Sequence, residues 1–242
     1  GMGGMPAANG VAAALMVAHG FTGVDDVFSG ERDFFHTFAP DGKGERAALA
    51  RGLGIDYEIS RAAIKRWPAG GPIQAPLDLV TELRAAHGFA VNDVIRLTVR
   101  VPQKILDVIN DRAMPDISLQ HLLAVTLVDG TLTHDTAHDY RRLRNPKIAA
   151  LKRRIEAVGD PRLTEVRSAS MEIELADGRR LSRETFAAKG SFRNPLTPEE
   201  LEHKALGLIE PVLGKARARK LLDALWRVEA LEIRTLASFH ID

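Results

Sequence analysis

The sequence predicts an α+β fold, in which helical segments at both ends of the chain flank an inserted α/β segment. Three observations predict it. Residues 6–19 are apolar in a helix-length block that glycine closes. Apolar and polar residues alternate strictly at 94–101 and again at 171–175, a pattern typical of half-buried strands. A capping box with proline at 197–200 then opens another helix, so helices precede and follow the strands.

The first segment, residues 1–56, is expected to be helical and to belong to a helical domain. Its main helix, 6–19, ends at Gly20 and is apolar on nearly every side. Such a helix is normally buried, so neighbours are expected on several of its faces. A short helix and a cluster of phenylalanines typical of a core are expected at 24–38. Residues 41–44 form a turn sequence.

The middle segment, residues 57–190, is expected to mix strands and helices. Its strands are expected at 57–64, 94–101, 171–175 and 179–186. An Asp177-Gly178 turn joins the last two strands into a hairpin. Its helices are expected at 77–87, 119–128 and 146–158. In the second strand, the alternation predicts one buried face made of Ile95, Leu97, Val99 and Val101.

The last segment, residues 191–242, is expected to return to helical structure. Thr197-Pro198-Glu199-Glu200 combines a capping box with proline at the first helical position. Helices are expected at 198–213, 216–228 and 232–239.

Composition excludes several classes of partner. The 242 residues carry a formal net charge of +1, so no overall field favours nucleic acid or a membrane surface. No signal peptide and no transmembrane helix is expected, because no apolar run is long enough. Cysteine is absent, which excludes disulfides and thiolate chemistry and favours a cytoplasmic location.

One loop, residues 64–76, combines cations with rigid breaks. Lys65 and Arg66 follow an apolar run, and Trp-Pro and Gly-Gly-Pro breaks separate them from the helix at 77–87. A loop of this kind can present side chains and free N–H groups to a small anion. The alternative is a rigid connector between two domains.

Several stretches, in this order along the chain, resemble the MmgE/PrpD family of lyases and isomerases. They are Asn9-Gly10-Val11 with Gly20-Phe21-Thr22-Gly23, Lys65-Arg66-Trp67-Pro68, Ile117 to Gly130, Asn145-Pro146, Leu175 to Gly178, and Arg193 to Thr197. The family includes dehydratases, decarboxylases and epimerases that act on small di- or tricarboxylates such as 2-methylcitrate. The resemblance covers nearly the whole chain but only the C-terminal half or so of a usual family member.

The resemblance implies a layout and partners. Family members have an all-helical domain, an inserted α/β lid and a return to the helical domain. They need no cofactor and no metal, and they dimerise. Their remaining catalytic groups, an aspartate and histidines, belong to the N-terminal half. The resemblance therefore implies either a homodimer or a separate subunit that supplies that half.

The resemblance also implies site residues. Lys65 matches the active-site lysine of the family, and Arg66 is a further cation for substrate carboxylates, or else a solvent-exposed side chain. Where family members carry histidine shortly after the proline, this chain has Gly70 and Gln74. Gln74 can hydrogen-bond a substrate but cannot titrate. His121 replaces a tyrosine and is expected to be catalytic, since imidazole titrates near neutrality; the alternative is a satisfied helix histidine.

Two hypotheses for function follow. The chain is the C-terminal part of a cofactor-independent lyase or isomerase, or it is a truncated, catalytically inactive member that acts as a binding or interaction subunit. No metal site is expected. His134 and His138 have the spacing of two ligands on one helix face, but no third ligand is evident.

Overall fold

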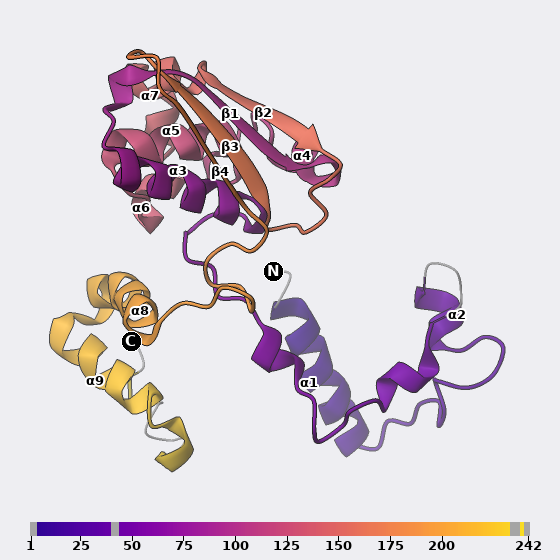
Figure 1. The fold of residues 1–242 in the computed structure, drawn as a ribbon. Helices are drawn as coiled ribbons and strands as arrows, with labels where there is room; N and C mark the ends of the chain where they lie inside the picture. Colours follow the sequence, from indigo (N-terminus) through magenta and orange to yellow (C-terminus); the bar gives the residue numbers. More distant parts are fainter. Residues whose placement is uncertain (1–3, 40–43, 233–237, 240–242) are drawn as a thin grey trace. The chain divides into compact units, whose positions relative to one another are not determined.

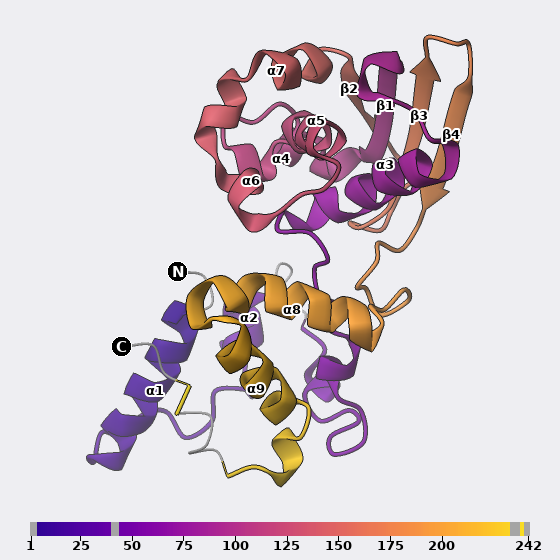
Figure 2. The same ribbon diagram turned by 90° about the vertical axis from the view of Figure 1, so that its left-hand side faces the viewer.

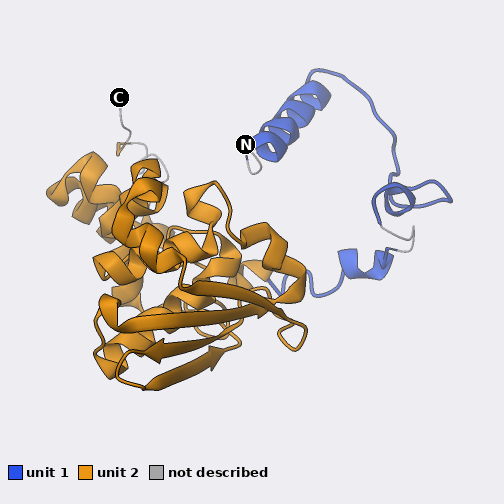
Figure 3. Ribbon diagram, turned by 90° about the horizontal axis from the view of Figure 1, so that it is seen from above, with its two compact units in different colours: residues 1–57 blue, residues 58–242 orange. Residues whose placement is uncertain are grey.

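The computed structural model describes residues 4–39, 44–232 and 238–239 (Figure 1). The chain divides into two compact units, 1–57 and 58–242 (Figure 3). The C-terminal helices therefore share a unit with the sheet. The turn expected at 41–44 and most of the helix expected at 232–239 lie outside the described residues.

The first unit contains the helix predicted at 6–19, which is α1 (Gly4–Ala18), and the five-residue α2 (Phe34–Phe38). No residue of α1 is buried, so its own unit does not supply the neighbours expected for it. The four phenylalanine rings of residues 28–38 contact one another, with centroids 4.8 to 6.3 Å apart. Phe34 and Phe38 are 45% and 71% exposed, so the expectation of a buried aromatic core is wrong.

The second unit is built on a four-stranded mixed sheet. Its strands are β1 (Val94–Pro102), β2 (Ile155–Asp160), β3 (Ala169–Leu175) and β4 (Arg180–Thr185). The spatial order is β2-β1-β3-β4, with β1 and β2 parallel and the other two pairs antiparallel. The predicted hairpin between β3 and β4 is confirmed, and Gly178 takes the positive φ of +87° that its turn needs.

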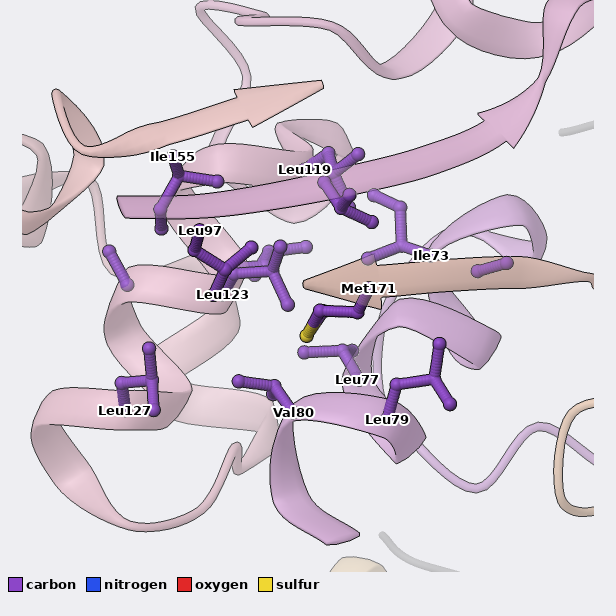
Figure 4. Close-up of a cluster of buried hydrophobic side chains, with 14 of the residues drawn as sticks. Ile73, Leu77, Leu79, Val80, Leu97, Leu119, Leu123, Leu127, Ile155 and Met171 are labelled. Carbon is purple, nitrogen blue, oxygen red and sulfur yellow. The ribbon is translucent and has the colours of Figure 1, made fainter. Parts of the chain in front are cut away.

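Helices pack on one face of this sheet. They are α3 (Gln74–His87), α4 (Leu106–Ile109), α5 (Leu119–Asp129), α6 (His134–His138) and α7 (Pro146–Lys152). Helix α3 contacts β3 and β4, and α5 contacts β2 (Figure 2). Leu77, Leu123 and Met171 lie in the core between the layers (Figure 4). Two further helices, α8 (Pro198–Leu213) and α9 (Lys215–Leu225), follow the sheet in the chain.

The fold is therefore α+β, as the alternating and helical patterns predict. Among the described residues no helix combines the length and the apolar character that crossing a bilayer requires. The division into three segments at 56/57 and 190/191 remains a prediction.

Three expectations about local structure are wrong. Residues 57–64 contain a 3-10 turn, Glu58–Arg61, and not a strand. A strand needs a run of backbone hydrogen bonds to a neighbouring strand. Here the Ala62 N–H donates back to the Ile59 oxygen, as in a turn, and the Ile64 N–H donates to the Gly190 oxygen. The helix expected at 146–158 ends at Lys152, and the following residues form β2, because they pair in parallel with β1. Ile95 is 54% exposed, since the register of β1 against β3 shifts between Val94 and Arg96.

Candidate functional site

The loop that carries Lys65 and Arg66 is held in shape by the side chain of Gln74. The amide oxygen of Gln74 accepts from the Trp67 N–H at 2.9 Å. Its Nε2 donates to the carbonyl oxygens of Trp67 and Ala69, at 2.9 and 3.1 Å. Gln74 is buried at the start of α3, so its side chain satisfies backbone N–H and C=O groups of the turn in place of water. The contact between Gln74 and a substrate remains a prediction. In this structure the Gln74 amide group holds the backbone of the loop in shape.

Arg66 lies over a buried carboxylate. Asp78, one turn into α3, accepts from Trp67 Nε1 at 2.8 Å and from the Lys189 N–H at 2.7 Å. The Arg66 guanidinium is 3.5 Å from the same carboxylate and 4.8 Å from the centroid of the Trp67 ring. Burial raises the pKa of Asp78, and the two hydrogen bonds and Arg66 oppose that rise. Arg66 is therefore half-buried and oriented, and not a freely solvated side chain.

The loop is also tied to the segment before α8. The Ile64 N–H donates to the Gly190 oxygen at 2.8 Å, one residue before Lys65. Gly190 has a φ of +86°, and a Cβ added there would stand 1.9 Å from the Ile64 oxygen. Only glycine fits this crossing without displacement of the backbone.

Arg66 lines a pocket of about 560 Å³. Its wall is formed by residues 66–68 of the loop, residues 131–134 after α5, and one face of α8 from Glu199 to Leu208. Besides Arg66, the ionisable groups on this wall are His134, Glu199, Glu200, His203 and Lys204. Lys189 forms an ion pair with Glu200 at 3.0 Å, which neutralises one of the two acids.

Lys204 has an unusual electrostatic environment. Partial burial first, and the positive charge of Lys65 second, lower the pKa of its ammonium group. Lys65 itself is exposed, and it has no ion-pair partner among the described residues. Lys65 and Lys204 therefore repel each other beside Arg66, and an anion bound between the two lysines would relieve that repulsion. A lysine with a lowered pKa is also a candidate for proton transfer.

His121 lies elsewhere. It is 1% exposed, and it lines a separate pocket of about 440 Å³ that also contains Asp111, Lys152 and Arg153. Neither ring nitrogen has a hydrogen-bond partner. Burial first, then the charges of Lys152 and Arg142, lower the pKa of its imidazole to about 4. The pockets of Arg66 and His121 share no residue, so the four predicted site residues do not converge.

His134 and His138 stack on α6, with ring centroids 4.4 Å apart. His138 Nδ1 is 2.8 Å from the His134 carbonyl oxygen, and its Nε2 is 3.9 Å from Asp116. The described residues contain no group of three or more candidate ligands that could hold a metal ion.

Comparison with known proteins identifies the family of this chain. Residues 67–228 match the MmgE/PrpD C-terminal domain. The chain belongs to the MmgE/PrpD family. It is also 23% identical to the cis-aconitate decarboxylase of Mus musculus over 175 residues, which are 69% of this chain and 35% of the mouse protein. This MmgE/PrpD chain thus spans about a third of the length of that relative.

Sequence reasoning missed His203 and Lys204 as pocket residues. The helical spacing of these residues was a usable signal. Glu199, His203 and Gly207 are four positions apart, and so are Glu200, Lys204 and Leu208, which is the spacing of side chains on one helix face. These six positions make one face of α8. This face and residues 66–68 line the same pocket although they are far apart in the sequence. No local sequence pattern predicts such a meeting.

Proposed function

We propose that this chain is the carboxylate-binding C-terminal part of a cofactor-independent lyase or isomerase. Its substrate class is a small di- or tricarboxylate, such as 2-methylcitrate or cis-aconitate. The family supports the reaction class at a coarse level. The observation that carries the proposal is the pocket that Arg66 and Lys204 line together. Lys65, the residue before Arg66, does not line this pocket but is close enough to Lys204 to lower the pKa of its ammonium group.

The chemistry assigns roles to these groups. Removing a proton beside a carboxylate leaves negative charge that fixed cations stabilise. Lys65 and Arg66 bind the substrate carboxylates, and Lys204 takes or returns a proton. His121 remains a candidate acid–base group only if a partner segment brings its pocket to the substrate. The other catalytic groups belong to the N-terminal half that family members have, and the active assembly is a dimer or a pair of complementary subunits in the cytoplasm.

The alternative is an inactive family member that binds a partner or a carboxylate without turnover. One observation favours it. Gln74, at a position where family members carry histidine, uses its amide inside the loop and cannot titrate. Both hypotheses include an α/β lid that closes over a helical domain.

Isothermal titration calorimetry of the chain with cis-aconitate and with 2-methylcitrate tests the proposal. We expect binding of at least one acid, and at least a tenfold loss for Lys65→Ala and for Lys204→Ala, equivalent to about 1.4 kcal/mol each. Lys220→Ala, on the exposed face of α9 outside the pocket, is the matched control and should bind normally. A chain that binds neither acid would overturn the proposal.

Turnover separates the two hypotheses. Loss of cis-aconitate or 2-methylcitrate is followed with the chain alone and with a family N-terminal half added. Binding without turnover under both conditions favours the inactive member.

A further inference from the structure

A second pocket, of about 430 Å³, is bordered by other residues of the same part of the chain. Arg61, Ala63 and Gly71 border it, whereas residues 66–68 border the Arg66 pocket. The two pockets share no residue. Three arginines line the second pocket against a single carboxylate, that of Glu165. Its wall therefore carries an excess of positive charge in a chain that is nearly neutral overall.

Arg167 is the central cation of this pocket. It is partly buried, and its side chain makes no hydrogen bond and no ion pair with any described residue. Its Nε and Nη2 stand 3.8 and 3.9 Å from the place that a Cβ on Gly71 would take. Gly71 begins the 3-10 turn that precedes α3. The unpaired guanidinium group of Arg167 points to an anionic ligand.

A second arginine of the lining, Arg193, is only weakly neutralised. It is 3.9 Å from Glu165, at the limit of an ion pair, and 70% of its side chain is exposed. An exposed pair of this length contributes little, so the Arg193 guanidinium group remains available to a ligand that offers better geometry. Arginine forks suit the paired oxygens of phosphate and carboxylate groups.

The same pocket has an apolar side. Phe186 and Phe192 are 56% and 59% exposed and both line it. Ser191, which also lines the pocket, has a buried hydroxyl without a hydrogen-bond partner. Large exposed rings beside an unpartnered polar atom are typical of a ligand surface, where an apolar body and one polar group are held together.

We propose that this pocket binds an organic anion, with a phosphate or carboxylate group on Arg167 and a planar or apolar body against Phe186 and Phe192. The site is separate from the Arg66 pocket and does not depend on the function proposed for it. It gives the chain a second ligand, in a pocket that shares no residue with the Arg66 pocket.

Calorimetry with the full chain tests the site, with phenyl phosphate, inorganic phosphate and benzoate as probes. We expect phenyl phosphate to bind at least tenfold more tightly than inorganic phosphate, because the ring adds contact with the phenylalanines. Arg167→Gln should weaken phenyl phosphate tenfold or more. Phe192→Ala should reduce its affinity to that of inorganic phosphate and leave inorganic phosphate unchanged. Benzoate distinguishes the head groups, since binding as tight as that of phenyl phosphate assigns a carboxylate ligand.

Two controls make the result specific. Arg179→Gln removes an exposed arginine that pairs with Asp177 in the hairpin, and should bind all probes normally. Lys65→Ala should also leave phenyl phosphate binding unchanged, and cis-aconitate should not displace it. Equal affinity in wild-type and Arg167→Gln protein, with unchanged melting temperatures, overturns the proposal. So does displacement by cis-aconitate, which would merge the two pockets into one site.

Discussion

Single residues show how hydrogen-bond partners decide what a buried polar group contributes to this chain. Gln74 and Asp78 are both buried at the start of α3, and both are fully used in holding the loop. His121 is equally buried and has no partner. The first two therefore stabilise the fold, whereas His121 costs free energy whenever it takes up a proton.

We predict that His121 makes stability depend on pH. Its pKa falls from an ordinary 6.5 to about 4 in the fold, so the unfolded chain binds more protons between these values. The free energy of unfolding should therefore decrease as pH falls from about 6.5 to 4, by up to about 3 kcal/mol. Urea denaturation across this range measures it. His121→Gln should flatten the dependence, and His87→Gln, at the exposed end of α3, should not. An unchanged slope in His121→Gln would contradict this origin.

We predict a large cost for Gly190→Ala. The new Cβ would meet the Ile64 oxygen at 1.9 Å, and the positive φ adds strain, so we expect a loss of about 2–4 kcal/mol. Gly178→Ala is the matched control, because its φ is also near +87° but nothing lies within 4 Å. It should lose only about 1 kcal/mol. Equal losses in chemical denaturation would mean that the crossing at Ile64 relaxes freely.

Among the elements, α8 is the one whose start the sequence specifies most completely. The Thr197 hydroxyl accepts from the Glu200 N–H at 3.2 Å, and the Glu200 carboxylate accepts from the Thr197 N–H at 2.8 Å. Glu200 also pairs with Lys189, which joins the cap to the segment that follows the sheet. The cap thus sets the start of the face that carries His203 and Lys204.

We predict that Thr197→Ala destabilises the chain by about 1 kcal/mol, because an orphan N–H of the first turn loses its acceptor. Thermal denaturation measures the loss, and faster amide exchange in α8 locates it. Thr164→Ala, an exposed threonine with no hydrogen bond among the described residues, is the control. If both variants melt alike, the capping box contributes nothing measurable.

At the scale of the whole molecule, the main cluster of buried apolar side chains comes from residues 67–188 of the second unit, and no apolar side chain among the described residues of the first unit is buried. In the first unit, α1 exposes apolar side chains along its whole length, with Val11, Leu15 and Met16 between 49% and 62% exposed. Contiguous apolar surface of this kind is unusual for a monomer and marks an interaction site.

We predict that the chain self-associates or pairs with a separate N-terminal half through α1. Leu15→Lys places a charge in that contact and should shift the protein toward monomer, or precipitate it, in light scattering at low micromolar concentration. Ile55→Lys, on an exposed residue outside any helix, is the control. A monodisperse wild-type species of 26.4 kDa would contradict the prediction.

The sequence by itself determined the helix caps, the hairpin turn and the family. The caps at Asn145 and Thr197, the turn at Gly178 and the alternation in β1 and β3 are encoded within a few residues, because capping and pleating are short-range. The ordered resemblance to MmgE/PrpD proteins, which the family match confirms, is likewise written in the chain itself.

Only the tertiary structure decided which of these residues meet. Residues 155–160 became a strand because β1 was available to pair with them, and Ile95 faces outward because of a register shift. Helix α8 brought Lys204 to the Arg66 pocket, while packing against α7 enclosed His121 in another. Burial and charge proximity depend on contacts between residues far apart in the sequence, so no local pattern could assign the site.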